Sequence, residues 1–255
     1  MASFMKVLLL LLCLPVLAQG PDFHDRADHG DPPYLFGRGW KPLLNSKDLA
    51  GWVGEAGKPH GWITTGAVWV DASAPKKLGA VDEPGSRILN SLAGKANNLV
   101  TSEKFGDIEL YLEFLIPQGS NSGVYLQGLY EVQVFDSYGV AQPKESDGGG
   151  IYHKWIDNKP VGGSSPKVNA SRPPGQWQSY HIWFRAPRFD AAGKKTANAR
   201  FERVLFNSTV VQDAVEIDGP TRSALQIPEA ATNPLMLQGD HGPVAFRNIW
   251  WRPLE

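Results

Sequence analysis

The segment Tyr130–Phe135 combines polar and apolar side chains in a pattern that could support chemistry. Glu131 and Gln133 alternate with Val132 and Val134. Successive side chains of a β-strand point to opposite faces, so the valines are predicted to face the core and the polar pair the other side. A carboxylate and an amide on one face can hydrogen-bond sugar hydroxyls or hold a metal ion. An ordinary solvated sheet face is the alternative interpretation.

The preceding segment extends this polar set. Asn121, Tyr125 and Gln127 lie just before it in the sequence, and the alternation is expected to place them on the same face. Polar groups clustered beside aromatic side chains are typical of ligand sites. We therefore predict that Asn121, Tyr125, Gln127 and Gln133 contact a substrate.

A long stretch without strand periodicity, residues 137–174, carries a second group of candidates. Three consecutive glycines at 148–150 precede Tyr152, His153 and Lys154. A phenol, an imidazole and an amine are three different types of general acid or base. Loops of this length in a compact domain usually have a function or lack order. These three residues are therefore predicted to be catalytic, although a lone histidine is more often structural.

A tight turn near the C-terminus supplies the last candidates. Gln238 precedes Gly239, and Asp240 and His241 follow before a further glycine. Such a turn presents side chains at the rim of a sheet, where functional residues are frequent. Gln238 and Asp240 are predicted to contact substrate, and His241 to be catalytic. The alternative is a structural hairpin turn in which Asp240 bonds its own backbone.

Short β-strands must position these residues. No long helical repeat of apolar residues is present, whereas period-two segments recur between Gly-, Pro- and Asn-rich turns. Residues 108–114, 121–127 and 130–135 are predicted to be three consecutive antiparallel strands, and residues 187–198 a surface excursion. Further strands are predicted within 61–70, 98–102, 178–185, 199–206, 234–238 and 244–252. The pattern predicts an all-β sandwich or jelly roll.

Composition narrows the partners. The formal net charge is −1 and no basic run is present, which argues against nucleic acid and anionic membranes. Nine tryptophans could stack on sugar rings, although most are expected in the core. The sequence does not indicate an oligomeric state.

The first residues resemble a secretory signal peptide. Lys6 precedes the apolar run 7–14, Pro15 breaks that run, and a small residue, Ala18, stands at the expected cleavage point. We predict a signal peptide over 1–18, a solvated polar leader over 19–40 and a single domain over 41–255. Cleavage would remove Cys13, the only cysteine. The mature protein is expected to be exported, periplasmic or extracellular, with no membrane attachment.

Several segments together resemble the 3-keto-disaccharide hydrolase family, long known as a domain of unknown function in exported bacterial proteins. They occur in the family's order from Leu43 to Leu254. The resemblance implies a concanavalin A-like jelly-roll β-sandwich of two antiparallel sheets. Gln127 stands where family members often carry a basic residue, which could alter substrate choice. The matching segments are 43–52, 121–126, 130–136, 150–152, 174–177, 237–242 and 246–249.

The resemblance further implies action on glycosides oxidised to a ketone at C3. A base removes the acidified C2 proton, the glycosidic oxygen leaves by elimination, and water adds. A divalent metal ion could serve as electrophile, with Glu131 and His241 as candidate ligands or base; no organic cofactor is expected. The partner would be an oligosaccharide or glycoside. The competing function is a non-catalytic carbohydrate-binding module, since the same fold hosts lectins.

Overall fold

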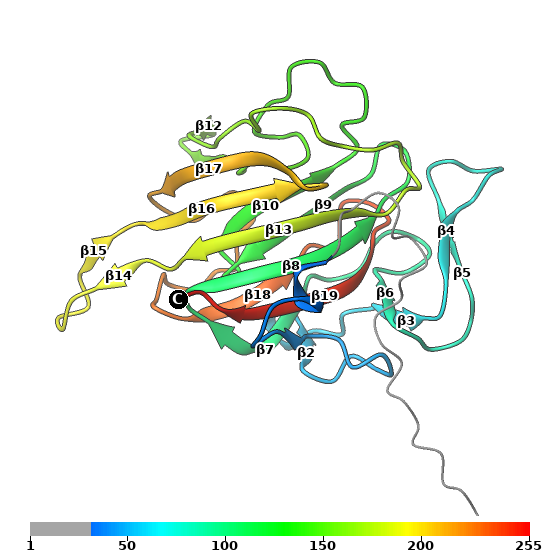
Figure 1. Cartoon of the computed structure of the whole chain (residues 1–255), viewed down its shortest axis with the longest axis horizontal. Helices are drawn as coiled ribbons and strands as arrows, with labels where there is room; N and C mark the ends of the chain where they lie inside the picture. The colour runs from blue at the N-terminus through cyan, green and yellow to red at the C-terminus, as the bar shows by residue number, and fades with distance from the viewer. Residues whose placement is uncertain (1–31) are drawn as a thin grey trace, which may run out of the picture.

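The computed structural model describes residues 32–255, which form a concanavalin A-like jelly roll of two antiparallel sheets (Figure 1). The larger sheet has the order β17 (Thr209–Ile217), β16 (Ala199–Phe206), β13 (Gln178–Arg185), β8 (Ile108–Leu115), β19 (Ala245–Pro253), β6 (Arg87–Leu89) and β3 (Ile63–Thr65), with β1 (Lys41–Pro42) beside β19. The smaller sheet has the order β10 (Tyr130–Phe135), β9 (Asn121–Leu126), β18 (Asn233–Leu237), β7 (Leu99–Phe105) and β2 (Trp52–Gly54).

Three hairpins and two short 3-10 turns complete the described chain. The hairpins are β4–β5 (Val68–Val70, Leu78–Ala80), β11–β12 (Lys154–Ile156, Lys159–Val161) and β14–β15 (Arg188–Phe189, Lys195–Ala197). The turns are η1 (Pro33–Leu35) and η2 (Glu55–Gly57). Two of the hairpins lie inside stretches that the sequence predicted to be irregular, 137–174 and 187–198. No helix in residues 32–255 is long and apolar enough to span a membrane.

The core lies between the two sheets. Leu110 and Leu112 of β8 face Val132 and Val134 of β10 across it, and all four are fully buried. Each such side chain contributes about 1.5–3 kcal/mol when it leaves water. The alternation in the sequence thus assigns the inner faces of both strands correctly, and it turns Glu131 toward the outer face of the smaller sheet.

The predicted three-strand meander is wrong. β8 pairs with β13 and β19 in the larger sheet, whereas β9 pairs with β10 and β18 in the smaller one. The segment between β8 and β9 therefore crosses from one sheet to the other, with a turn closed by the Ser120 amide, which donates to the Pro117 carbonyl at 3.2 Å. A hairpin and a crossing of this length have the same local sequence pattern, because both need only a short turn between alternating strands.

Buried ion pairs cover the outer face of the larger sheet. The Arg247 Nε donates to Glu113 at 2.6 Å. The Arg252 Nε donates to Glu109 at 2.6 Å, and the His181 ring lies 2.8 Å from the same carboxylate. The acidic residues that alternate along β8 are therefore held in structural pairs, whereas the buried side-chain oxygen of Gln133 on the smaller sheet has no partner in the described chain.

The predicted leader is not solvated throughout. Tyr34 in η1 is buried, stacks on Trp250 at 4.5 Å between ring centroids and meets Tyr111 edge-on at 5.6 Å. These aromatic contacts fix the last part of the leader against the larger sheet, although its sequence is mostly polar. The predicted signal peptide and the rest of the leader lie outside the described residues.

Candidate functional site

Glu131 is at the centre of the candidate site. It lies on β10 opposite Tyr125 of β9, and only 2 % of its surface is exposed. The Tyr125 hydroxyl is hydrogen-bonded to the Glu131 carboxyl, and it also donates to the main-chain carbonyl of Arg222 at 3.2 Å. β10 is the edge strand of its sheet, and the Glu131 amide is satisfied by the Thr221 hydroxyl at 3.2 Å.

A glycine makes room for this carboxyl. Gly123 lies on β9 opposite Gln133, two pairs along from the Glu131–Tyr125 pair and therefore on the same face. A Cβ at this position would collide with Glu131 Oε1 and with the Tyr125 ring. Any larger residue would displace the carboxyl, so Gly123 is required here for space.

Glu131 is largely protonated at neutral pH. Burial raises the pKa of its carboxyl from the ordinary 4.5 to about 8. The hydrogen bond between Tyr125 and the carboxyl opposes this shift, and the negative charge of Asp240 adds to it. A neutral carboxylic acid can donate a proton or a hydrogen bond, whereas a carboxylate cannot. A carboxyl with such a shifted pKa is also typical of functional sites.

The predicted catalytic loop brings Tyr152 beside Glu131. The Tyr152 amide donates to the Glu131 carbonyl at 3.2 Å, continuing the edge of β10. Burial and the charge of Glu131 raise the pKa of the Tyr152 phenol, and the positive charge of Arg222 opposes that shift. Tyr152 therefore keeps its proton at neutral pH and could act as an acid.

His153 packs against Tyr152 within the same loop. The two rings stack with centroids 4.2 Å apart. The imidazole is buried, and neither ring nitrogen has a hydrogen-bond partner among the described residues. Glu145 Oε1 approaches Nδ1 to 3.4 Å, which becomes an ion pair only if the ring is protonated. The loop thus places a second titratable ring behind the phenol.

The C-terminal turn closes the site from β18. The main-chain amide of Gln238 donates to the Gly123 carbonyl at 3.0 Å, which places Gln238 next to the glycine that makes room for Glu131. The side-chain oxygens of Gln238 and Gln133 are buried, and neither has a hydrogen-bond partner among residues 32–255. Asp240 and His241 are half-exposed at the rim, with Asp240 Oδ1 2.5 Å from His241 Nδ1. This contact orients the imidazole and directs its Nε2 away from Asp240.

Two of the predicted residues, Lys154 and Asn121, do not lie beside Glu131. The Lys154 ammonium pairs with Asp218 at 2.5 Å, because β11 turns Lys154 to the face opposite His153. Asn121 is half-buried at the far end of the same sheet face, opposite Phe135.

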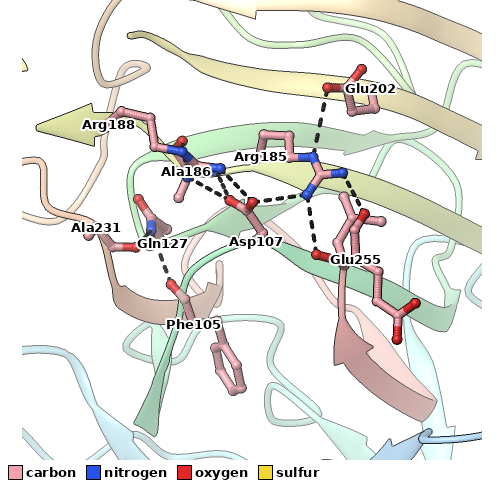
Figure 2. A network of polar contacts seen from close by, with 10 residues as sticks. Phe105, Asp107, Gln127, Arg185, Ala186, Arg188, Glu202, Ala231 and Glu255 are labelled. Atoms are coloured by element: carbon pink, nitrogen blue, oxygen red, sulfur yellow. Dashed lines mark hydrogen bonds and ion pairs between the residues drawn. The ribbon is translucent and has the colours of Figure 1, made fainter. Parts of the chain in front are cut away.

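Gln127 does not line the predicted face. It lies in the β9–β10 turn with a φ of 55°, which ends the strand alternation. Its buried amide donates to the carbonyls of Phe105 (3.0 Å) and Ala231 (3.2 Å), as Figure 2 shows. Nearby in Figure 2, Asp107 binds Arg185 and Arg188. Gln127 thus ties the hairpin turn to neighbouring segments. The prediction that it lies on the same face as Glu131, where it would contact substrate, is wrong.

Sequence reasoning missed Thr221, Arg222 and Trp155. The first two belong to a segment without periodic pattern, which lies along the open edge of β10. The Arg222 guanidinium lies 3.9 Å from the centroid of the Trp155 ring. In the sequence, only the position of an aromatic residue directly after Tyr152, His153 and Lys154 could have indicated Trp155.

The donor set does not fit a metal centre built from ionisable side chains. In the described chain, no group of three or more His, Cys, Asp or Glu residues is placed to hold an ion. Glu131 is deeply buried and largely neutral, and His241 is engaged by Asp240. The predicted pair of ligands, Glu131 and His241, therefore lacks a third ionisable partner in the described chain.

Comparison with solved structures supports the fold. A crystal structure of a proposed glycosyl hydrolase from Parabacteroides distasonis is 28% identical, with a TM-score of 0.62, and the match covers 85% of this chain and 84% of that one. A second from the same organism is 16% identical (TM-score 0.57, covering 89% and 100%), and a third is 22% identical (TM-score 0.50, covering 84% and 99%). No curated protein shows a significant match to the chain.

A family model also covers nearly the whole described domain. It is that of the 3-keto-alpha-glucoside-1,2-lyase-like domain, and it matches residues 39–252. The match agrees with the ordered segments found in the sequence and with the jelly-roll architecture. The chain belongs to the 3-keto-alpha-glucoside-1,2-lyase-like domain family.

Proposed function

We propose that the protein cleaves the glycosidic bond of 3-keto-glycosides, including 3-keto-disaccharides, by elimination followed by hydration, and that it does so outside the cytoplasm. The observation that carries the proposal is the buried, largely neutral carboxyl of Glu131 among Tyr125, Tyr152 and Asp240. Family membership and the similar glycosyl hydrolase structure support carbohydrate as the substrate class.

The reaction needs three groups. A base removes the proton on C2, which the C3 ketone acidifies, and the electron pair forms an enolate with negative charge on the C3 oxygen. The enolate then expels the C1 oxygen, leaving a C1=C2 double bond conjugated with the ketone. An acid protonates the departing oxygen, and water adds back across the double bond to give the free 3-keto sugar.

Glu131 is assigned to the C3 oxygen. A neutral carboxylic acid held in a buried site can hydrogen-bond a developing oxyanion, as a protonated aspartate does in ketosteroid isomerase. The raised pKa of Glu131 keeps this proton in place at neutral pH. One such donor typically contributes about 10²–10³-fold in kcat.

His241 and Tyr152 are assigned to the two proton transfers. His241 is held through Nδ1 by Asp240, which leaves Nε2 to accept the C2 proton. Tyr152, whose pKa is raised, keeps its proton for the leaving oxygen. The unpartnered amide oxygens of Gln133 and Gln238 accept hydrogen bonds from sugar hydroxyls.

The test is turnover of 3-keto-trehalose and of a methyl 3-keto-glucoside. Release of reducing sugar and transient ultraviolet absorbance of the unsaturated ketone are followed, with and without a chelator. Wild-type protein should turn over substrate, and Glu131→Ala, which removes the donor, should lose at least about 100-fold in kcat. Glu103→Ala is the matched control, since Glu103 is exposed on β7 of the same sheet.

The proposed enzymatic function would be refuted if the protein bound the 3-keto-glycoside without turnover both with chelator and with added Mg²⁺, Mn²⁺, Ca²⁺ or Zn²⁺. It would support a carbohydrate-binding module instead. Turnover that stops with chelator and returns with one ion would show that a metal takes part, and that the electrophile is not Glu131 alone.

A further inference from the structure

A hollow of about 570 Å³ adjoins the candidate site beyond the edge of β10. It lies between Trp155 and Ile156 of β11 and the segment 220–227. That segment also contacts the site, because Thr221 binds the Glu131 amide and Arg222 accepts from Tyr125. One wall of the hollow is therefore shared with the backbone that frames Glu131.

A stacked pair of side chains forms part of this wall. Trp155 is 44% exposed, and the Arg222 guanidinium lies over its ring, 3.9 Å from the ring centroid. Among residues 32–255, no carboxylate forms an ion pair with Arg222. Stacking leaves the guanidinium N–H groups free in their plane, where they can donate to ligand oxygens.

The remaining lining is mixed in character. Ile156 and Leu225 contribute apolar surface, whereas Ser223 and Gln226 contribute a hydroxyl and an amide. The nearby Lys154 is already paired with Asp218. An apolar platform with hydrogen-bond donors at its rim matches a ring that has apolar faces and oxygens around its edge, such as a pyranose or an aryl group.

We infer that this hollow binds the leaving-group ring of the substrate, and that Trp155 and Arg222 set the preference for ring-bearing over small alkyl leaving groups. The inference rests on the proposed function for its assignment of the ring as the leaving group. Its position next to Tyr152, the acid assigned to the departing oxygen, agrees with that assignment.

The experiment compares Trp155→Ala with Trp69→Ala. Trp69 is a matched control because it is 48% exposed and lies on the separate β4–β5 hairpin (Figure 1). The first readout is the ratio of kcat/KM for phenyl over methyl 3-keto-glucoside. Trp155→Ala should lower this ratio about ten-fold, the loss of one stacking contact, and Trp69→Ala by less than about two-fold. Trp155→Phe should restore most of the ratio.

The second readout does not require turnover. Calorimetric titration with phenyl glucoside and methyl glucoside, neither oxidised at C3, should show tighter binding of the phenyl compound to wild type. Trp155→Ala should remove this difference, and Trp69→Ala should keep it.

Equal binding of the two glucosides by wild type, or an unchanged kcat/KM ratio in Trp155→Ala, would overturn the subsite. If no 3-keto-glycoside is cleaved but the binding difference depends on Trp155, the proposed function fails while the ring site stands.

Discussion

Replacing Glu131 by glutamine should change how the stability of the protein depends on pH. The native carboxyl has its pKa raised by burial from 4.5 to about 8. Between these values the folded chain holds a proton that the unfolded chain releases, so stability falls as pH rises through this window. This shift of about 3.5 pH units corresponds to at most about 5 kcal/mol in the free energy of unfolding. All of this contribution is lost above pH 8.

The assay is urea denaturation at pH 5, 7 and 9 for wild type and Glu131→Gln. Glutamine keeps nearly the same size and cannot titrate, so the effects of all other groups largely cancel in the difference. From pH 5 to pH 9, wild type should lose about 4 kcal/mol more than the variant. Any fixed cost of the amide appears at every pH and does not alter this comparison.

Glu103→Gln serves as the control, because this exposed residue should give a curve parallel to wild type. Parallel curves for Glu131→Gln as well would mean that the native carboxyl is ionised at neutral pH. The assignment of Glu131 as a neutral hydrogen-bond donor would then be wrong. The same assignment predicts that kcat/KM of wild type falls as pH rises past about 8, and that Glu131→Gln lacks this alkaline limb.

Three further substitutions test the neighbourhood. Val132→Asp should abolish folding, seen as loss of the cooperative thermal transition, because it buries an unpaired charge in the core, whereas Glu131→Ala should fold and lose turnover. Gly123→Ala should lower kcat at least about 100-fold by displacing the Glu131 carboxyl, while Gly219→Ala, which meets only ordinary contacts, should retain activity; equal effects would show that space at Gly123 is unimportant. His241→Ala should remove turnover, because the Nε2 atom of this ring is assigned to accept the C2 proton; near-native turnover would make the turn structural.

Strand alternation predicted the inner faces because it reflects a local property. The predicted bounds 178–185 and 199–206 coincide with β13 and β16, and the valines of β10 are in the core. Pairing between strands is not local, and the predicted meander failed for that reason. The ion pairs on β8 also could not be predicted, since their basic partners come from β19, more than 130 residues away in sequence.

The candidate site was predictable only where alternation persists. Glu131, Gln133 and Tyr125 share a face as the period of two requires. Gln127 does not share that face, because β9 ends at Leu126 and Gln127 adopts a positive φ in the turn, where strand alternation no longer applies. Arg222 comes from a segment with no period at all, and its main-chain contacts with Tyr125 and His153 bring it to the site.

The buried carboxyl of Glu131, rather than the unpaired groups around it, distinguishes an enzyme from a simple sugar-binding surface. In the described chain, seven buried side-chain nitrogen or oxygen atoms lack a hydrogen-bond partner, and four of them belong to Gln133, His153 and Gln238. Each such atom costs about 1–3 kcal/mol. Sugar hydroxyls could satisfy the amide oxygens in either function. A carboxyl buried deeply enough to stay protonated near pH 8 is different, because binding alone would be served as well by an amide, which does not lose stability as pH rises. Donation to an oxyanion that forms only during reaction gives that proton a use, and for this reason we favour catalysis over binding.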